Sequence, residues 1–267
     1  MKSQFLYLLS FFWLAFVVSN AALSPEVYSK IKLPNTQIPK VIKDVLPHTD
    51  HNSNSSQKVY LGNFDFGLWP WHHAATEKEI RELKDDHNNF LYKPYFFEND
   101  LKKGNIINFP SFNDKNDAPF LSPKREEILC NFIRVMVDFM LSELRTNNIQ
   151  AITTEVQGES TQVFQKYTME KVEEIADRKN MVCHKVNYPY AVHYCHVGGR
   201  TKTFMVSMIG VDGTKVKTLS VCHQDTSFWT PKGLPFVVLN VKPRTTPICH
   251  FLPNDQIVIF PSKRAIN

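Results

Sequence analysis

Four Cys-His dipeptides lie in the last third of the chain, and their residue types suit two different chemistries. They are Cys183-His184, Cys195-His196, Cys222-His223 and Cys249-His250, separated by 10, 25 and 25 residues. Adjacent residues of a β-strand point to opposite faces of the sheet. If the dipeptides lie in strands, one face receives the thiols and the other receives the imidazoles. This arrangement separates disulfide formation from metal binding.

The histidines of the dipeptides, His184, His196, His223 and His250, are candidate metal ligands. Neutral imidazole suits Cu(II) and Zn(II). A zinc site of two Cys and two His usually has two or more residues between paired ligands, and cysteines in disulfides supply no thiolate. We therefore expect copper, with zinc as the weaker candidate; the alternative is that the rings only pack or face solvent. Asp225 would either orient an imidazole or cap a turn.

The start of the chain has the pattern of a secretory signal peptide. Lys2 supplies the positive charge of the first region, and residues 5–18 form an apolar run of 14 residues. Ser19 and Ala21 are small residues that suit cleavage after residue 21. The run is shorter than the roughly 20 residues that span a membrane. We expect a secreted protein without a membrane span after cleavage.

Export predicts that the cysteines form disulfides, because the secretory compartment is oxidising. Cys183, Cys195, Cys222 and Cys249 are the candidates, and three pairings are open. A hairpin turn centred on Pro189 would bring Cys183 opposite Cys195 and place His184 and His196 on a diagonal of the other face. Cys130 is left over, as a buried thiol or an intermolecular link. No Cys-x-x-Cys motif points to thiol redox chemistry.

The composition indicates a folded protein without nucleic-acid partners. The chain has 267 residues, of which 43% are hydrophobic and 12% aromatic, which is typical of a globular protein. Its formal net charge is +5, and the basic residues are spread rather than clustered, so a nucleic-acid surface is not indicated. A weak attraction to an acidic cell-wall polysaccharide is compatible with this charge.

Residues 22–94 form a variable leader that we expect to be loosely structured, because prolines and polar residues interrupt it. Asn54 lies in the glycosylation sequon Asn54-Ser55-Ser56. An aromatic island, residues 60–71, contains Trp69 and Trp71, and large aromatic residues usually serve packing, here as an anchor of the leader on the domain. Residues 77–84 are compatible with a short helix.

Residues 95–267 predict one α+β domain with a C-terminal antiparallel β-sheet or small barrel, braced by disulfides. A long helix is expected over 122–145, where Ser122 and Pro123 suit its first turn. A shorter helix is expected over 167–179. Two hairpins are expected from alternating apolar residues around turns at 187–190 and 212–213. The predicted strands cover 182–186, 191–196, 203–211, 216–222, 236–241, 246–251 and 256–260.

The dipeptides and their spacing resemble the plant BURP domain. Phe96-Phe97 with Asp100-Leu101 and Gly104 is similar to the opening of that domain, and so are residues 222–227 and 247–251. The resemblance covers about residues 95–262 and is nearest to the seed- and embryo-type members. Family members often carry two further cysteines before the first dipeptide, where this chain has Cys130 alone.

The resemblance implies a copper-dependent peptide cyclase that cross-links a Trp or Tyr side chain of a peptide, in its own chain or in another one. Residues 105–121 contain no Trp or Tyr, so Trp69 and Trp71 are the candidate residues within this chain. The alternative is a non-enzymatic protein of the cell wall or storage vacuole. Such a protein would act in seed or reproductive development or in the stress response.

Overall fold

A computed structural model describes residues 25–39, 74–84, 93–110, 127–130, 133–158, 164–177, 179–186 and 192–262. The predicted signal peptide, Asn54 and the aromatic island with Trp69 and Trp71 lie outside these residues. Within the described ranges, no helix is both long enough and apolar enough to cross a membrane.

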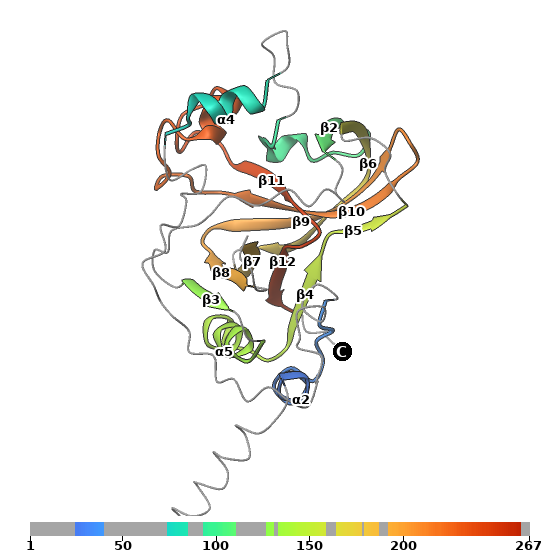
Figure 1. Cartoon of the computed structure of the whole chain (residues 1–267), viewed down its shortest axis with the longest axis vertical. Coiled ribbons are helices and arrows are strands. Elements are labelled where there is room, and N and C mark those ends of the chain that lie inside the picture. The colour runs from blue at the N-terminus through green and yellow to red at the C-terminus, as the bar shows by residue number, and fades with distance from the viewer. Residues whose placement is uncertain are drawn as a thin grey trace, which may run out of the picture.

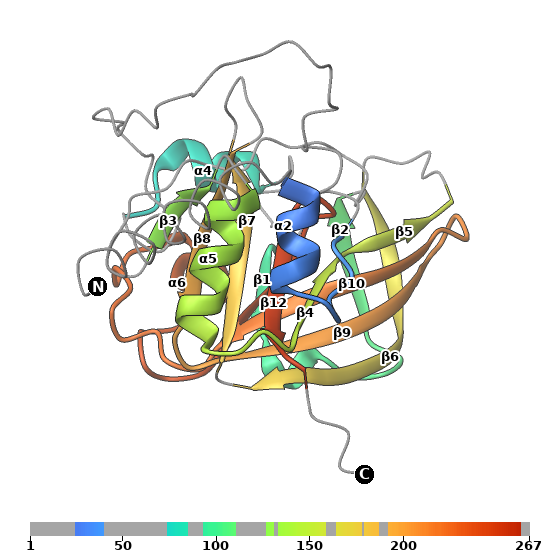
Figure 2. The same ribbon diagram turned by 90° about the horizontal axis from the view of Figure 1, so that it is seen from below.

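The larger of two antiparallel sheets in the described part of the chain has seven strands. It curls into an open half-barrel around its own apolar core (Figure 2). Its order is β1 (Tyr95–Phe97), β11 (Ile248–Leu252), β10 (Lys215–His223), β9 (Thr201–Gly210), β6 (Phe164–Asp177) and β2 (Ile106–Pro110), while β5 (Glu155–Gln157) pairs with β10. The 3-10 turn η1 (Glu98–Asp100) follows β1.

The smaller sheet has five strands and is covered by helices on its outer face. Its order is β3 (Glu127–Cys130), β8 (Val192–Gly198), β7 (Asn180–Val186), β12 (Ile257–Pro261) and β4 (Ile149–Thr153). The helices α5 (Ile133–Leu144) and α2 (Pro25–Lys32) lie side by side against this face (Figures 1 and 2).

The two sheets pack against each other through a layer of buried side chains, which determines where the histidines lie. This layer contains Val182 of β7, Val221 of β10 and Leu252 of β11, each at most 2% exposed. A third core lies beside it, between α4 (Glu77–Glu82) and α6 (Leu234–Leu239), and includes Tyr95, Trp229 and Ile248.

The two predicted hairpins are confirmed. β7 pairs with β8, and β9 pairs with β10, both antiparallel. Alternation of apolar residues around short turns is a local signal, and here the tertiary structure agrees with it. The expected C-terminal antiparallel sheet with disulfides is therefore present, and the described part of the chain has more strand than helix.

The long predicted helix over 122–145 is wrong over residues 127–130. Residues Glu127–Cys130 form strand β3, which pairs with β8 so that Cys130 lies opposite His193. Helix α5 begins only at Ile133. Pairing at the edge of the smaller sheet overrides the helix-starting residues upstream, because strand preference depends on neighbouring strands more than on local sequence.

The short predicted helix over 167–179 is also wrong, since residues 164–177 form strand β6. This strand pairs with β2 on one side and β9 on the other, and both Tyr167 and Met169 are 0% exposed. Register shifts between Met169 and Lys171 and between Glu174 and Ala176 interrupt its alternation. These irregularities mask the two-residue period of a strand in the sequence.

The strand predicted over 236–241 is a helix, α6. Pro235 lies in its first turn, and Asn240 ends it in the left-handed conformation at φ 53°. Proline at the start and asparagine at the end are common helix boundaries. Burial of one face against the third core outweighs the strand preference of its valines.

Two segments of the predicted leader pack on the domain. Leu33, which follows α2, is 4% exposed in the core beneath α5, and the Thr36 hydroxyl donates to the Ile149 carbonyl oxygen at 2.8 Å. Tyr28 of α2 donates to Asp138 of α5 at 2.5 Å. Leu83 is 8% exposed in the third core. The boundary between leader and domain at residue 95 stays a prediction.

Replacing Leu33 with alanine should lower the free energy of unfolding by about 2–5 kcal/mol, the usual cost of truncating a buried leucine. Ile31 is the matched control, because it lies on the same segment and is 60% exposed. Ile31→Ala should change stability by no more than about 0.5 kcal/mol. Urea unfolding of the purified protein measures both, and equal effects would contradict a structural role for this segment.

Candidate functional site: two histidine pairs between the sheets

Two disulfides join neighbouring strands within the described residues. Cys183 of β7 is bonded to Cys195 of β8, with Cα atoms 4.0 Å apart, and Cys222 of β10 is bonded to Cys249 of β11, with Cα atoms 3.9 Å apart. Each pair is directly opposite in its ladder. The sequence left three pairings open, and this is the one the structure has.

Each disulfide faces away from the other sheet. Cys183 and Cys195 belong to the core beneath α5, while Cys222 and Cys249 belong to the core inside the curled sheet. Alternation along each strand therefore turns the adjacent histidine toward the layer between the sheets. His184 shares its face with Val182, and His223 shares its face with Val221, and both valines are part of that layer.

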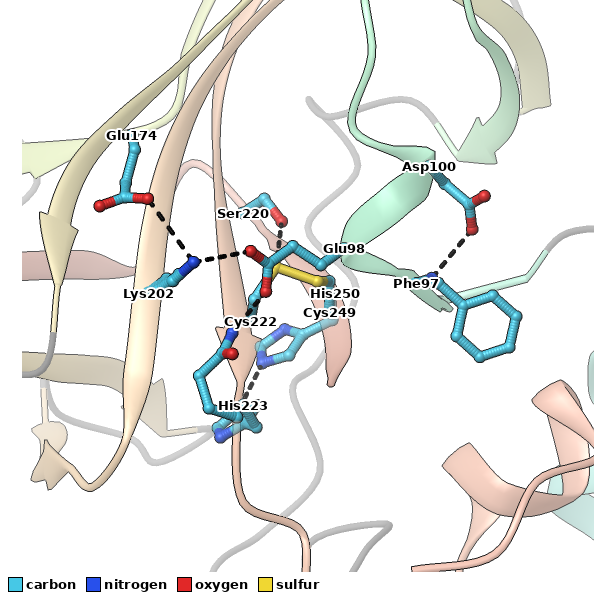
Figure 3. Close-up of a disulfide and its surroundings, with 11 residues drawn as sticks. Phe97, Glu98, Asp100, Glu174, Lys202, Ser220, Cys222, His223, Cys249 and His250 are labelled. Atoms are coloured by element: carbon cyan, nitrogen blue, oxygen red, sulfur yellow. Dashed lines mark hydrogen bonds and ion pairs between the residues drawn. A yellow bond between two sulfur atoms is a disulfide. The ribbon is translucent and has the colours of Figure 1, made fainter. Parts of the chain in front are cut away.

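The histidines meet as two pairs, one on each sheet. The Nε2 atoms of His184 and His196 are 3.2 Å apart, and their rings are stacked at an angle of 5°. The Nε2 atoms of His223 and His250 are 3.3 Å apart, with their rings at 13°. Figure 3 shows the second pair beside the Cys222–Cys249 disulfide.

One histidine of each pair is fixed by a hydrogen bond from its other ring nitrogen. His184 Nδ1–H donates to Gln256 Oε1 at 2.8 Å, and His250 Nδ1–H donates to the Phe251 carbonyl oxygen at 3.3 Å. In the neutral ring this bond leaves the lone pair on Nε2, the atom that faces the partner histidine. Such a bond also holds the tautomer and orientation that a metal ligand needs.

Aromatic side chains enclose the pairs. The Trp229 ring meets His223 edge-on with centroids 4.9 Å apart, and the Tyr95 ring meets His250 edge-on at 6.4 Å. Tyr194 lies against His196 at 5.8 Å. His184 is only 2% exposed, whereas the other three histidines are half-buried. The site is therefore open on the side of these three rings.

Burial lowers the pKa of three of these histidines, and for two of them repulsion between the rings adds to it. Burial lowers the pKa of His184 well below its usual value, and the charges of His196, His250 and His223 lower it further. Burial is also the main cause that lowers the pKa of His223, followed by His250 and His196. Burial lowers the pKa of His250 to about 4. Neutral imidazole is the form that binds metal ions.

An ion-pair network fixes η1 next to the second pair (Figure 3). Lys202, directly opposite Cys222 in the ladder, contacts Glu98 of η1 at 2.9 Å and Glu174 at 3.8 Å. Gln224, the neighbour of His223, donates to the other Glu98 oxygen at 2.5 Å. The bond to Glu98 raises the pKa of Lys202, so the ammonium stays charged.

Comparison with known proteins agrees with the dipeptide pattern. The family model of the BURP domain matches residues 123–261, more than half of the chain. The chain belongs to the BURP domain family. Residues 93–110, which contribute β1, η1 and β2 to the larger sheet, lie before the matched range.

The curated relatives of this BURP domain protein come from plants. BURP domain protein RD22 of Arabidopsis thaliana is 31% identical over 262 residues, which cover 79% of this chain and 65% of the relative. BURP domain-containing protein 3 of rice is 34% identical, covering 70% of this chain and 54% of the relative. Embryonic abundant protein VF30.1 of Vicia faba is 29% identical and covers 100% of this chain and 98% of the relative.

The BURP domain presents two pairs of nitrogen donors, and each pair fits two ligands of one ion. Metal–nitrogen bonds of about 2.0 Å place two adjacent ligand nitrogens roughly 3 Å apart, close to the observed 3.2 and 3.3 Å. Among the residues the structure describes, no three His, Cys, Asp or Glu side chains are grouped closely enough to hold a metal ion. Imidazole donors suit copper or zinc, and the two pairs do not form one group in this structure.

The residues that contact the histidine rings are not the one that the sequence suggested. Asp225 is exposed and accepts a hydrogen bond from the Ser227 backbone at 2.9 Å, as in the turn alternative. Gln256, Trp229 and Tyr95 contact the rings and were not predicted. Gln256 reaches His184 because β12 lies beside β7, and that pairing has no local signal in the sequence.

The metal-free domain should lose stability as the pH falls from about 6.5 toward 4. Unfolded histidine titrates near 6.5, and His250 in the folded chain titrates at about 4. Between these values the unfolded chain binds a proton that the folded chain does not, which favours unfolding. Above pH 6.5 the effect is absent.

The measurement is urea unfolding in EDTA at pH 7 and pH 4.5, for wild type and His250→Gln. Protonation of carboxylates also lowers stability at low pH, equally in both proteins. The difference between the two proteins therefore gives the contribution of His250. The variant should lose less stability than wild type between the two pH values. An identical loss would contradict a lowered His250 pKa.

Proposed function

We propose that this BURP domain protein holds copper on His184, His196, His223 and His250 and oxidises an aromatic side chain of a peptide. The observation that carries the proposal is the pairing of Nε2 atoms at 3.2 and 3.3 Å on sheet faces that pack together. Imidazole is a preferred copper ligand. Family resemblance supports copper over zinc, and so does the use of all four dipeptide cysteines in disulfides.

The protein contributes fixed ligands, a partly dry site and an open side. Gln256 and the Phe251 carbonyl oxygen hold His184 and His250 with Nε2 toward the site. Trp229 and Tyr95 exclude water from one side of the second pair. When bound, copper supplies one-electron oxidation of a Trp or Tyr side chain, with dioxygen as the oxidant.

The peptide would come from this chain or from another one. Within this chain, Trp69 and Trp71 of the leader are the candidate residues. The disulfides support passage through the secretory pathway, because they persist in oxidising compartments. The proposed destination is the apoplast or cell wall, with the vacuole as the alternative, and Asn54 would carry a glycan on this route.

A single copper ion shared by the two pairs requires the pairs to close around it, so the ion should be lost when either pair is broken. His184→Ala and His250→Ala should each reduce bound copper from about one equivalent to nearly none, measured by elemental analysis after dialysis. Gln256→Leu, which removes the partner of His184 Nδ1, should weaken copper binding by about 10–100-fold.

His193→Gln is the control for the copper measurement. This histidine is 1% exposed and alternates onto the Cys195 face of β8, so the variant should keep its copper. Two equivalents of bound copper in the wild type, with one of them lost in each alanine variant, would contradict a shared ion. Full retention in both alanine variants would exclude these ligands.

Oxidative cross-linking should form one bond between a Trp or Tyr side chain and a second position of the peptide, with one hydrogen lost from each and dioxygen reduced to hydrogen peroxide. Copper-loaded protein incubated with dioxygen should lose two hydrogens by mass spectrometry, in its own leader or in an added Trp-containing peptide. His223→Ala/His250→Ala should leave the mass unchanged under the same conditions. An unchanged mass in the wild type, for both the leader and the added peptide, would contradict the enzymatic proposal.

A non-enzymatic role in the seed is the second candidate. It is favoured by the Vicia faba relatives, which this chain matches over 98% of their length and which are described as embryonic abundant and unknown seed proteins. The domain would then be a disulfide-braced module that acts through its surface. Copper binding without the mass loss would favour this role in seed development or the stress response.

A further inference from the structure

A cavity of about 340 Å³ lies at the open side of the curled sheet, between β1, η1 and β2. Five of its lining residues are aromatic: Tyr95, Phe96, Phe97, Phe109 and Phe251. Phe251 follows His250 on β11 and points to the opposite face of that strand. The cavity is therefore separate from the histidine pairs but adjoins them through Tyr95.

The cavity wall is held in place before any ligand binds. The Phe96 and Phe251 ring centroids are 4.6 Å apart, and Phe109 meets Phe251 edge-on at 5.5 Å. Asp100 accepts a hydrogen bond from the Phe97 backbone N–H at 2.9 Å, and the Asn105 side chain donates to the Asp100 carbonyl oxygen at 2.8 Å. A pre-formed wall reduces the entropy lost on binding.

The lining favours a neutral aromatic ring. It contains one cation, Lys93, and one anion, Asp100, so its formal charge is zero. Asn105 and Asn108 add amide groups that can bond to a hydroxyl or an indole N–H. An apolar cavity of about 150 Å³ is enough for benzene, so the larger volume here accommodates a phenol or an indole. Such a combination is typical of ligand sites.

The apolar surface continues beyond the cavity, along the edge of the sheet. Ile106 of β2 lines the cavity and is 62% exposed. A ligand that covers Ile106 as well as the aromatic wall is longer than one ring. Amide side chains beside an apolar edge also suit the polar backbone of an extended peptide.

We propose that this cavity binds a Tyr or Trp side chain of the substrate peptide, at a position that flanks the reacting residue. The proposal rests on the proposed function, since it names where that peptide is held. Tyr95 of the edge strand β1 lines the cavity and contacts His250, so the cavity and the second histidine pair lie near the same edge of the sheet, on its opposite faces. The cavity thereby selects peptides with an additional aromatic residue.

The test is binding of short peptides to the full secreted chain in EDTA, by calorimetry or NMR titration. Acetyl-Gly-Trp-Gly-amide should bind at least tenfold more tightly than acetyl-Gly-Leu-Gly-amide. Ile106→Asp should weaken binding of the Trp peptide about tenfold, because it places a charge at the apolar rim. Ile31→Asp is the matched control, since Ile31 is 60% exposed on α2, and it should bind like wild type.

Phe109→Ala is a second test variant and should weaken binding of the Trp peptide. Thermal unfolding checks that this variant is folded. Equal affinity for the two peptides, or Trp-peptide binding unchanged by both Ile106→Asp and Phe109→Ala, would overturn the proposal. If free 3-methylindole binds as tightly as the Trp peptide, the ligand of this cavity is a small aromatic molecule, and the peptide proposal is overturned.

The metal-free condition separates this proposal from the copper proposal. His223→Ala/His250→Ala should still bind the Trp peptide in EDTA. If that variant binds the peptide and wild type takes up no copper, the copper site alone is excluded. If wild type takes up copper but binds neither peptide, the aromatic site alone is excluded.

Discussion

The pleat of the β-strand is the constraint on which the rest of this BURP domain depends. Adjacent side chains leave a strand on opposite faces, so a Cys-His dipeptide in a strand divides sulfur from imidazole. Cys183 faces the core beneath α5 and Cys222 faces the core inside the curled sheet, while His184 and His223 face the layer between the sheets. A slip of one residue in either ladder would exchange these faces.

The disulfides fix that register covalently. Each bond joins residues that are directly opposite in neighbouring strands, so neither strand can slide past its partner. The diagonal positions of the histidines follow from the same register, and this explains why both pairs have nearly equal Nε2 separations. Two local bonds thus determine the geometry of a site made from four strands.

Local sequence signals predicted the hairpins and the faces of the dipeptides, and they failed where distant strands decide the structure. Residues 164–177 contain charged residues typical of a helix, but β2 and β9 hold them in a strand on both sides. In the candidate site, the histidines were predictable from the dipeptides. Gln256 and Trp229 were not, because β12 and the segment after β10 reach the rings only in the folded chain.

Separation of the two faces also has a chemical consequence for the proposed copper site. A free thiolate is a strong ligand for copper in its reduced state and would compete with the imidazoles. Here the four dipeptide sulfurs are oxidised, 0% exposed and turned away from the inter-sheet layer. The remaining donors are neutral imidazoles, two of them fixed by Gln256 and the Phe251 carbonyl oxygen. The residue spacing that braces the fold therefore also leaves the histidines as the candidate ligands.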